Sequence, residues 1–258
     1  MRSPSPAGTE APPLRPDRWW LPPALTVVAL TAFVAYSTWA TLVNRDYYAR
    51  PYLSPFYSPC ITSHCGVGGR AATWHLVSWW PFSPAILIVV FPLAFRLTCY
   101  YYRKAYYRSF WLSPPACAVP DRHSTYTGES RFPLILQNAH RYFFYLALPL
   151  PVILAWEAVK AFHFPSGWGI GLGSAILVVN AVLLGLYTAS CHSCRHLCGG
   201  NLRAFSKGPV RYWLWRRVTA LNLRHMQLAW VSLGFVALAD LYVRLVAAGA
   251  FPDPHIVF

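Results

Sequence analysis

Five long apolar runs restrict this chain to a membrane. They cover residues 19–43, 79–99, 132–162, 168–192 and 219–251. Each run reaches the ~20 residues that a helix needs to cross a bilayer. Because hydrocarbon offers no hydrogen-bond partners, only helices and closed barrels cross it, and continuous runs of this length indicate helices. We therefore predict an all-α integral membrane protein, with five transmembrane helices in a bundle over residues 19–258.

The composition agrees with a membrane protein and argues against a nucleic-acid-binding one. The chain is 56% hydrophobic and only 12% charged, whereas a soluble chain carries about 25% charged residues. The net charge of +14 is also seen in nucleic-acid-binding proteins, but here the basic residues lie between the apolar runs. The expected surroundings are therefore membrane lipid and no nucleic acid. Residues 1–18 are rich in Pro and small polar residues, a composition that predicts a disordered tail.

The positions of Lys and Arg predict the orientation of the bundle. Of the 22 basic residues, 17 lie in the tail, in segment 96–141 or in segment 195–224, and 5 lie on the other side. Short cytoplasmic loops are enriched in Lys and Arg. This rule places the N-terminus in the cytoplasm and the C-terminus outside.

Cys60 and Cys65 belong to the outer loop 44–78. Proteins that face an oxidising space form disulfides, so we expect a small disulfide loop between these two cysteines. A metal site that includes His64 is the alternative.

A denser group of Cys and His closes the fourth run, in the sequence CHSCRHLCGG over residues 191–200. On a helix of 3.6 residues per turn, Cys191, Cys194 and Cys198 share one face, and His192 and His196 share another. A CxxC pair can hold one iron or zinc ion through two thiolates. All five side chains can ligate one centre only if the helix unwinds, which the following Gly-Gly would permit.

Two further histidines lie at the depth of this group. His140 is in the third run, about eight residues from its start, and His225 opens the fifth run. With Cys191 and Cys194 they fall near the inner edge of the hydrocarbon, where ionisable groups are costly without a partner and indicate function. Two Cys and two His suit zinc or a Rieske-type 2Fe-2S cluster, and two His alone suit a b-type haem.

The alternative for each of these residues is packing. A lone helical His is often a hydrogen-bonded packing residue, and this alternative stays open for His140. A lone Cys in a membrane usually acts as a small apolar side chain, which is our interpretation of Cys99 and Cys117.

Four segments in order resemble the membrane-anchor subunit of actinobacterial succinate dehydrogenases. They are CYYYRKAYYRSFWLSPPACAV (99–119), QNAHRYFFY (137–145), CHSCRHLCGG (191–200) and LRHMQLAW (223–230), and the resemblance covers roughly residues 20–250. It implies a five-helix anchor in the plasma membrane. In that family a flavoprotein subunit oxidises succinate, an iron–sulfur subunit relays the electrons, and the anchor passes them to quinone.

The chain departs from anchors that hold two b-type haems, because no His lies in its first or second run. It is more similar to the branch that carries a Rieske-type cluster in place of haem. That resemblance implies that Cys191 and Cys194 hold one iron while His140 and His225 hold the other, with His192 or His196 as competing ligands. A haem b-binding anchor, or a non-redox membrane protein with a structural metal site, remains the alternative.

The resemblance also implies a quinone pocket near this centre and a docking surface for the iron–sulfur subunit. Tyr101, Arg103, Trp213 and Arg224 are the expected quinone-binding residues, in a mostly apolar cleft. The basic, aromatic segments 96–131 and 195–224 would form the docking surface. No catalytic base or nucleophile stands out in the sequence, so succinate oxidation would belong to a partner.

Overall fold

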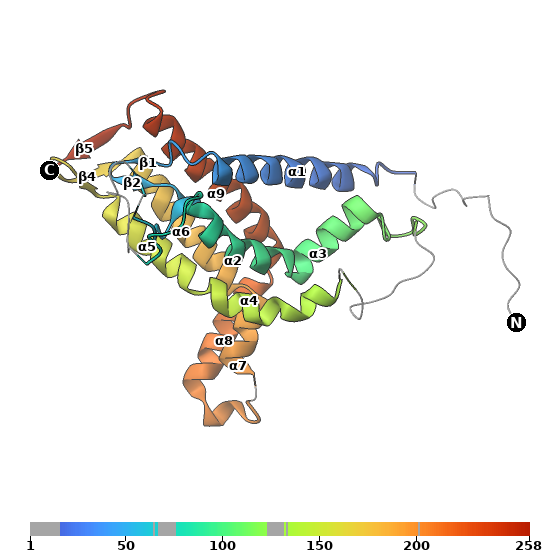
Figure 1. Cartoon of the computed structure of the whole chain (residues 1–258). Helices are drawn as coiled ribbons and strands as arrows, with labels where there is room; N and C mark the ends of the chain where they lie inside the picture. Colours follow the sequence, from blue (N-terminus) through green and yellow to red (C-terminus); the bar gives the residue numbers. More distant parts are fainter. Residues whose placement is uncertain (1–15, 64, 67–75, 123–131, 133, 201) are drawn as a thin grey trace, which may run out of the picture.

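A computed structural model describes residues 16–63, 65–66, 76–122, 132, 134–200 and 202–258 (Figure 1). Nearly all of the expected tail and His64 lie outside these residues, so the predicted disorder and the metal site of the outer loop remain predictions. The described part is mostly helical, which confirms the all-α membrane fold.

Four helical segments are long and apolar enough to span a bilayer. They are α1 (Leu21–Leu42), the segment Ile135–Lys160, α6 (Leu172–Ala189) and α9 (His225–Ala247). Helix α2 (Ala85–Leu97) and the helical segment Tyr100–Trp111 are apolar and long enough only when taken together, and they are bent by 78° at a short break, as in a broken span or a re-entrant loop. The described residues thus provide four crossings, or five if this bent pair is one crossing.

The bent pair and the segment Ile135–Lys160 are each built from several pieces. Segment Tyr100–Trp111 joins α3 (Tyr100–Tyr106) to a π-helical turn, η3 (Tyr107–Trp111). The third crossing joins a 3₁₀ turn, η5 (Leu134–Ala139), to α4 (His140–Ala147) and α5 (Pro149–Lys160). Pro149 opens α5, because proline fits the first turn of a helix, where its missing N–H is not needed.

The second run becomes helical later than expected. Helix α2 begins at Ala85 rather than near residue 79, because Pro81 and Pro84 precede it and proline disfavours helical backbone in the residue before it. The helix then breaks at Cys99, whose backbone is extended with ψ 127°. This break places Cys99 at a bend rather than within a continuous span.

The fifth run is two helices rather than one. Helix α8 (Pro209–Asn222) ends before α9 begins, and the α8 sequence carries Arg211, Arg216 and Arg217. These charged residues precede the predicted run, which begins in the last turn of α8 and consists mainly of α9. Helix α7 (His192–Gly199) and α8 instead project together from the end of the bundle (Figure 1).

The opposite end of the bundle carries short strands that the runs did not predict. Strands β1 (Tyr48–Ala49) and β2 (Tyr52–Leu53) form an antiparallel hairpin that a 3₁₀ turn, η1 (Pro55–Tyr57), follows. Strands β3 (His163–Phe164), β4 (Gly167–Gly171) and β5 (His255–Val257) form an antiparallel sheet. The C-terminal strand is therefore tied to the α5–α6 connection, at what we term the strand end (Figure 1).

Candidate functional site

The first contact of the site joins His140 to Cys191. His140 is the first residue of α4, and Cys191 directly precedes α7. The imidazole Nε2 lies 3.1 Å from the Cys191 Sγ, and its Nδ1 lies 3.0 Å from the Thr98 hydroxyl. The ring also stacks on Phe95 at 5.1 Å between centroids. Both imidazole nitrogens are therefore engaged, and the ring orientation is set from two sides.

A second His–Cys pair lies in the same buried cluster. His225 is the first residue of α9, and its Nε2 lies 3.4 Å from the Sγ of Cys99. Its Nδ1 lies 2.7 Å from the Ser190 hydroxyl, and its ring stacks on Tyr187 at 5.2 Å. Cys99 therefore contacts one of the predicted ligands, and it is also buried in the apolar core, in keeping with the packing role that its sequence context suggested.

All four of these side chains stand at the N-terminal ends of helices. Cys99 caps α3, Cys191 caps α7, and the two histidines open α4 and α9. We call Cys99, His140, Cys191 and His225 the His–Cys cluster. Helix N-termini carry partial positive charge, which stabilises Cys99 and Cys191 as thiolates when they bind a metal ion.

Cys194 lies beside this cluster. It is half-buried and packs against the core that contains Cys99 and Cys191, and it interacts with Cys198, four residues further along α7. Burial raises the pKa of Cys191 to about 11, and burial together with Cys198 raises the pKa of Cys194 to about 12. Without a metal, both thiols are therefore protonated at neutral pH.

The alternative histidine ligands both lie on α7. His196 Nδ1 interacts with the guanidinium of Arg141, and His192 is the first residue of α7. Within the described ranges, no three His, Cys, Asp or Glu side chains are placed to hold a metal ion between them. The predicted set of Cys191, Cys194, His140 and His225 is thus brought into one region, and its role as a ligand set remains a prediction.

Arg96 is a half-buried neighbour of the cluster that the sequence interpretation did not single out. Its guanidinium lies 4.3 Å from the ring centroid of Tyr187. It donates to the Tyr102 hydroxyl at 2.5 Å and to the Ser232 hydroxyl at 2.9 Å. In the sequence, a single Arg near the end of an apolar run could have pointed to this residue. Only the fold shows that Arg96 contacts Tyr187, the ring on which His225 stacks.

The expected quinone-binding residues lie on three different elements. Tyr101 packs against the core that contains the cluster, and its hydroxyl accepts a hydrogen bond from the Trp230 indole at 2.6 Å. Arg103 follows on α3, and Arg224 directly precedes α9. Trp213 is on α8 and is 55% exposed. The contacts of Tyr101 connect it to the cluster, while a quinone-binding role for all four residues remains a prediction.

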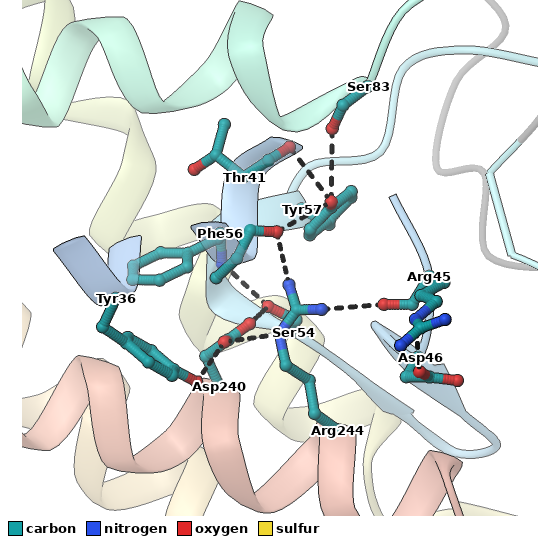
Figure 2. Close-up of polar contacts among 11 residues, drawn as sticks. Tyr36, Thr41, Arg45, Asp46, Ser54, Phe56, Tyr57, Ser83, Asp240 and Arg244 are labelled. Carbon is teal, nitrogen blue, oxygen red and sulfur yellow. Dashed lines mark hydrogen bonds and ion pairs between the residues drawn. The ribbon is translucent and has the colours of Figure 1, made fainter. Parts of the chain in front are cut away.

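A second polar group lies near the strand end and centres on an ion pair within α9 (Figure 2). Arg244 donates to Asp240 at 2.7 Å, and both side chains are buried. Asp240 also accepts hydrogen bonds from Tyr36, at 2.6 Å, and from Ser54. This group joins α9 to α1 and to the loop that follows α1. In the sequence, opposite charges four residues apart within an apolar run could have indicated this ion pair.

Arg244 holds the backbone of the outer loop as well. Its guanidinium donates to the carbonyl oxygens of Ala40, at 2.6 Å, and Arg45, at 2.7 Å (Figure 2). Nearby, the structure joins Cys60 and Cys65 in a disulfide, in the pairing that their position in the outer loop suggested. The Arg244 contacts fasten the end of α1 and the start of the outer loop to α9, whereas the disulfide closes a small ring within the loop itself.

Comparison with known proteins gives two results that agree. Residues 21–249 match the family described as actinobacterial succinate dehydrogenase subunit SdhC. A solved structure described as "Mycobacterium smegmatis Sdh1 complex in the apo form" contains a similar chain, with 50% sequence identity and a TM-score of 0.87. That similarity covers 98% of this chain and 98% of the other. No curated protein sequence matches this chain.

Proposed function

This chain belongs to the actinobacterial SdhC family of succinate dehydrogenase subunits, and from this premise we propose that it carries electrons from the iron–sulfur subunit of complex II to quinone. Its membership establishes the membrane-anchor role. The proposal adds a route for electrons, in which the His–Cys cluster holds a Rieske-type 2Fe-2S centre within the plasma membrane.

The observation that carries the proposal is the convergence of two thiols and two imidazoles at one place. Cys99, Cys191, His140 and His225 come from four separate elements and meet in a single buried region through two direct contacts, of 3.1 and 3.4 Å. Two Cys and two His are the donor set of a Rieske-type centre. The donor types therefore fit, and the contacts favour Cys99 over Cys194 as the second thiolate.

When bound, such a centre supplies one-electron transfer, and imidazole ligation gives it a higher potential than an all-Cys centre. The role of this chain's own residues would be to hold the two imidazole rings in position. Thr98 and Ser190 each engage the Nδ1 of one imidazole, which fixes the ring and leaves Nε2 directed at a thiol. Replacing the residue that forms a hydrogen bond with a ligating histidine typically lowers metal affinity by about 10–100-fold. Phe95 and Tyr187 stack on the rings and exclude water.

The partner subunits would dock at the end of the bundle where the cluster lies. The α7–α8 projection is basic and aromatic, with Arg195 over the Trp215 ring and Arg217 over the Trp213 ring. A surface of this kind suits a docked iron–sulfur subunit, which itself receives electrons from the flavoprotein subunit. Quinone would bind close to Tyr101, beside the cluster.

The test compares single variants of the chain purified with its associated subunits. We expect Cys99→Ser, Cys191→Ser, His140→Ala and His225→Ala each to lower the iron content and to remove one dithionite-reduced EPR signal. Cys117→Ser is the control, because this exposed thiol lies outside the cluster and should leave both readouts unchanged. The variant comparison is essential, since clusters of the partner subunits contribute overlapping signals.

Cys194→Ser decides between the two ligand sets. Retention of the signal in Cys194→Ser together with its loss in Cys99→Ser supports the His–Cys cluster. The reverse pattern would instead select the CxxC pair of Cys191 and Cys194. A Soret band that disappears in the His140→Ala and His225→Ala variants, without the iron–sulfur signal, would identify haem b and refute the proposal.

A further inference from the structure

Arg96 places a positive charge beside the His–Cys cluster. Its backbone carbonyl accepts a hydrogen bond from the Cys99 N–H at 3.2 Å, and its guanidinium lies 4.3 Å from the ring centroid of Tyr187. The His225 ring stacks on Tyr187 with 5.2 Å between the centroids. The guanidinium and the His225 ring are therefore within about 10 Å of each other, a distance at which charges interact strongly in a low-dielectric site.

Within the part of the chain that the structure describes, no carboxylate forms an ion pair with Arg96. The sequence explains why. No Asp or Glu occurs in segments 47–120, 130–156 and 158–239, and these segments supply all four residues of the His–Cys cluster. The only carboxylate of α9, that of Asp240, is paired near the strand end.

The observed partners of the Arg96 guanidinium are neutral. It donates to the hydroxyls of Tyr102 and Ser232 and, at 3.3 Å, to the carbonyl oxygen of Ala229. These contacts satisfy its N–H groups but leave its charge unbalanced. A half-buried charge in a membrane domain is costly without an opposite charge. The arrangement therefore indicates that the opposite charge comes from a group that the cluster holds.

We propose that this opposite charge is the electron accepted at the His–Cys cluster, and that Arg96 raises the reduction potential of the centre there. The inference rests on the proposed function. Two thiolates balance the charge of an oxidised 2Fe-2S core, so with neutral imidazoles the added electron leaves a net negative charge. One electron leaves the reduced iron–sulfur subunit and enters this centre, with no bond broken and no proton transferred. The Arg96 charge favours the reduced state.

An EPR-monitored redox titration of the purified complex tests this role. Arg96→Gln keeps a hydrogen-bonding side chain and removes the charge. A unit charge about 10 Å away, at an effective dielectric constant of about 20, changes the reduction equilibrium roughly tenfold. The potential of the centre should therefore fall by about 59 mV, whereas Arg96→Lys should keep most of the wild-type potential. Lys104→Gln is the control, because this exposed charge of α3 is screened by salt.

A second pair of variants leaves Arg96 in place. The Ser232 hydroxyl accepts a hydrogen bond from the guanidinium at 2.9 Å, and the side chain is fully buried. Ser232→Asp brings a carboxylate to Arg96 and should lower the potential in the same direction as Arg96→Gln. Ser232→Asn has nearly the same shape without the charge and should leave the potential close to that of the wild type. This pair separates charge from packing even if Arg96→Gln fails to assemble.

Equal potentials in the wild type, Arg96→Gln and Ser232→Asp would overturn the inference, as would equal shifts in Ser232→Asp and Ser232→Asn. A raised KM for quinone at an unchanged potential would instead make Arg96 a quinone ligand. The iron content should stay unchanged in all of these variants, which separates a shift in potential from loss of the centre. Failure of the proposed function would look different, because the wild-type complex would then lack the iron–sulfur signal that the cysteine variants remove.

Discussion

Removal of one partner of the buried ion pair in α9 should destabilise the protein strongly. In the Asp240→Ala variant the Arg244 charge stays buried without a carboxylate, and the hydroxyls of Tyr36 and Ser54 lose their acceptor. Breaking a buried pair from one side costs about 3–5 kcal/mol. We expect Asp240→Ala and Arg244→Ala each to fall in this range.

The double variant separates the charge from the packing. Without either charge, the cost reduces to the hydrogen bonds lost by Tyr36, Ser54 and the carbonyls of Ala40 and Arg45, at about 1 kcal/mol each. Asp240→Ala/Arg244→Ala should therefore cost about 4 kcal/mol, rather than the roughly 6–10 kcal/mol that the single variants sum to. The coupling energy should reach at least about 2 kcal/mol.

Equilibrium unfolding in mixed micelles provides the assay, with helical circular dichroism as the signal. The control is Asp46→Ala, which breaks the exposed pair with Arg45, whose side chains are 74% and 40% exposed. An exposed pair contributes about 0–1 kcal/mol. The reasoning is refuted if Asp240→Ala costs no more than Asp46→Ala, or if the two α9 variants are strictly additive.

Three further predictions concern the strand end. Cys60→Ser opens a disulfide loop with a sequence separation of 5 and should lower the unfolding free energy by about 2 kcal/mol by loop entropy, while reductant should no longer change the Tm. Gly169→Val places a side chain against the Ile256 carbonyl oxygen, which lies 2.5 Å from an added Cβ. This clash should detach β5 and expose it to limited proteolysis. An unchanged cleavage pattern would contradict the strand register. Burial and the carboxylate of Asp253 raise the pKa of Tyr52. The wild type should therefore be more stable than Tyr52→Phe by a constant amount below about pH 10, and by less as the pH rises further, because the phenol of the unfolded chain then ionises first. A stability difference that grows above about pH 10 in the unfolding assay would contradict this sign.

The depth of residues along each crossing could be derived from the sequence. A helix advances 1.5 Å per residue, so the apolar runs place His140, Cys191 and His225 at one level before any contact is known. The same argument separates Cys60 and Cys65 from them by a bilayer thickness. Local periodicity and the hydrophobic effect are enough for this level of description.

The choice of Cys99 over Cys194 as the partner of a histidine required the fold. Cys99 faces His225 because α2 ends two residues earlier and the chain turns there. Cys194 meets Cys198 because residues four apart share a face of α7, as the helical spacing of the CHSCRHLCGG run predicted. The turn at Cys99, in contrast, has no strong local signal in the sequence.

The sequence by itself determined that this chain crosses a membrane about five times and that chemical groups gather at two depths, because the lengths of apolar runs and the alternation of crossings are local properties of the chain. Only the tertiary structure decided which of these groups touch. Contacts such as that of Tyr36 with Asp240, 204 residues apart, depend on the rotation and tilt of each helix, which the packing of the neighbouring helices determines.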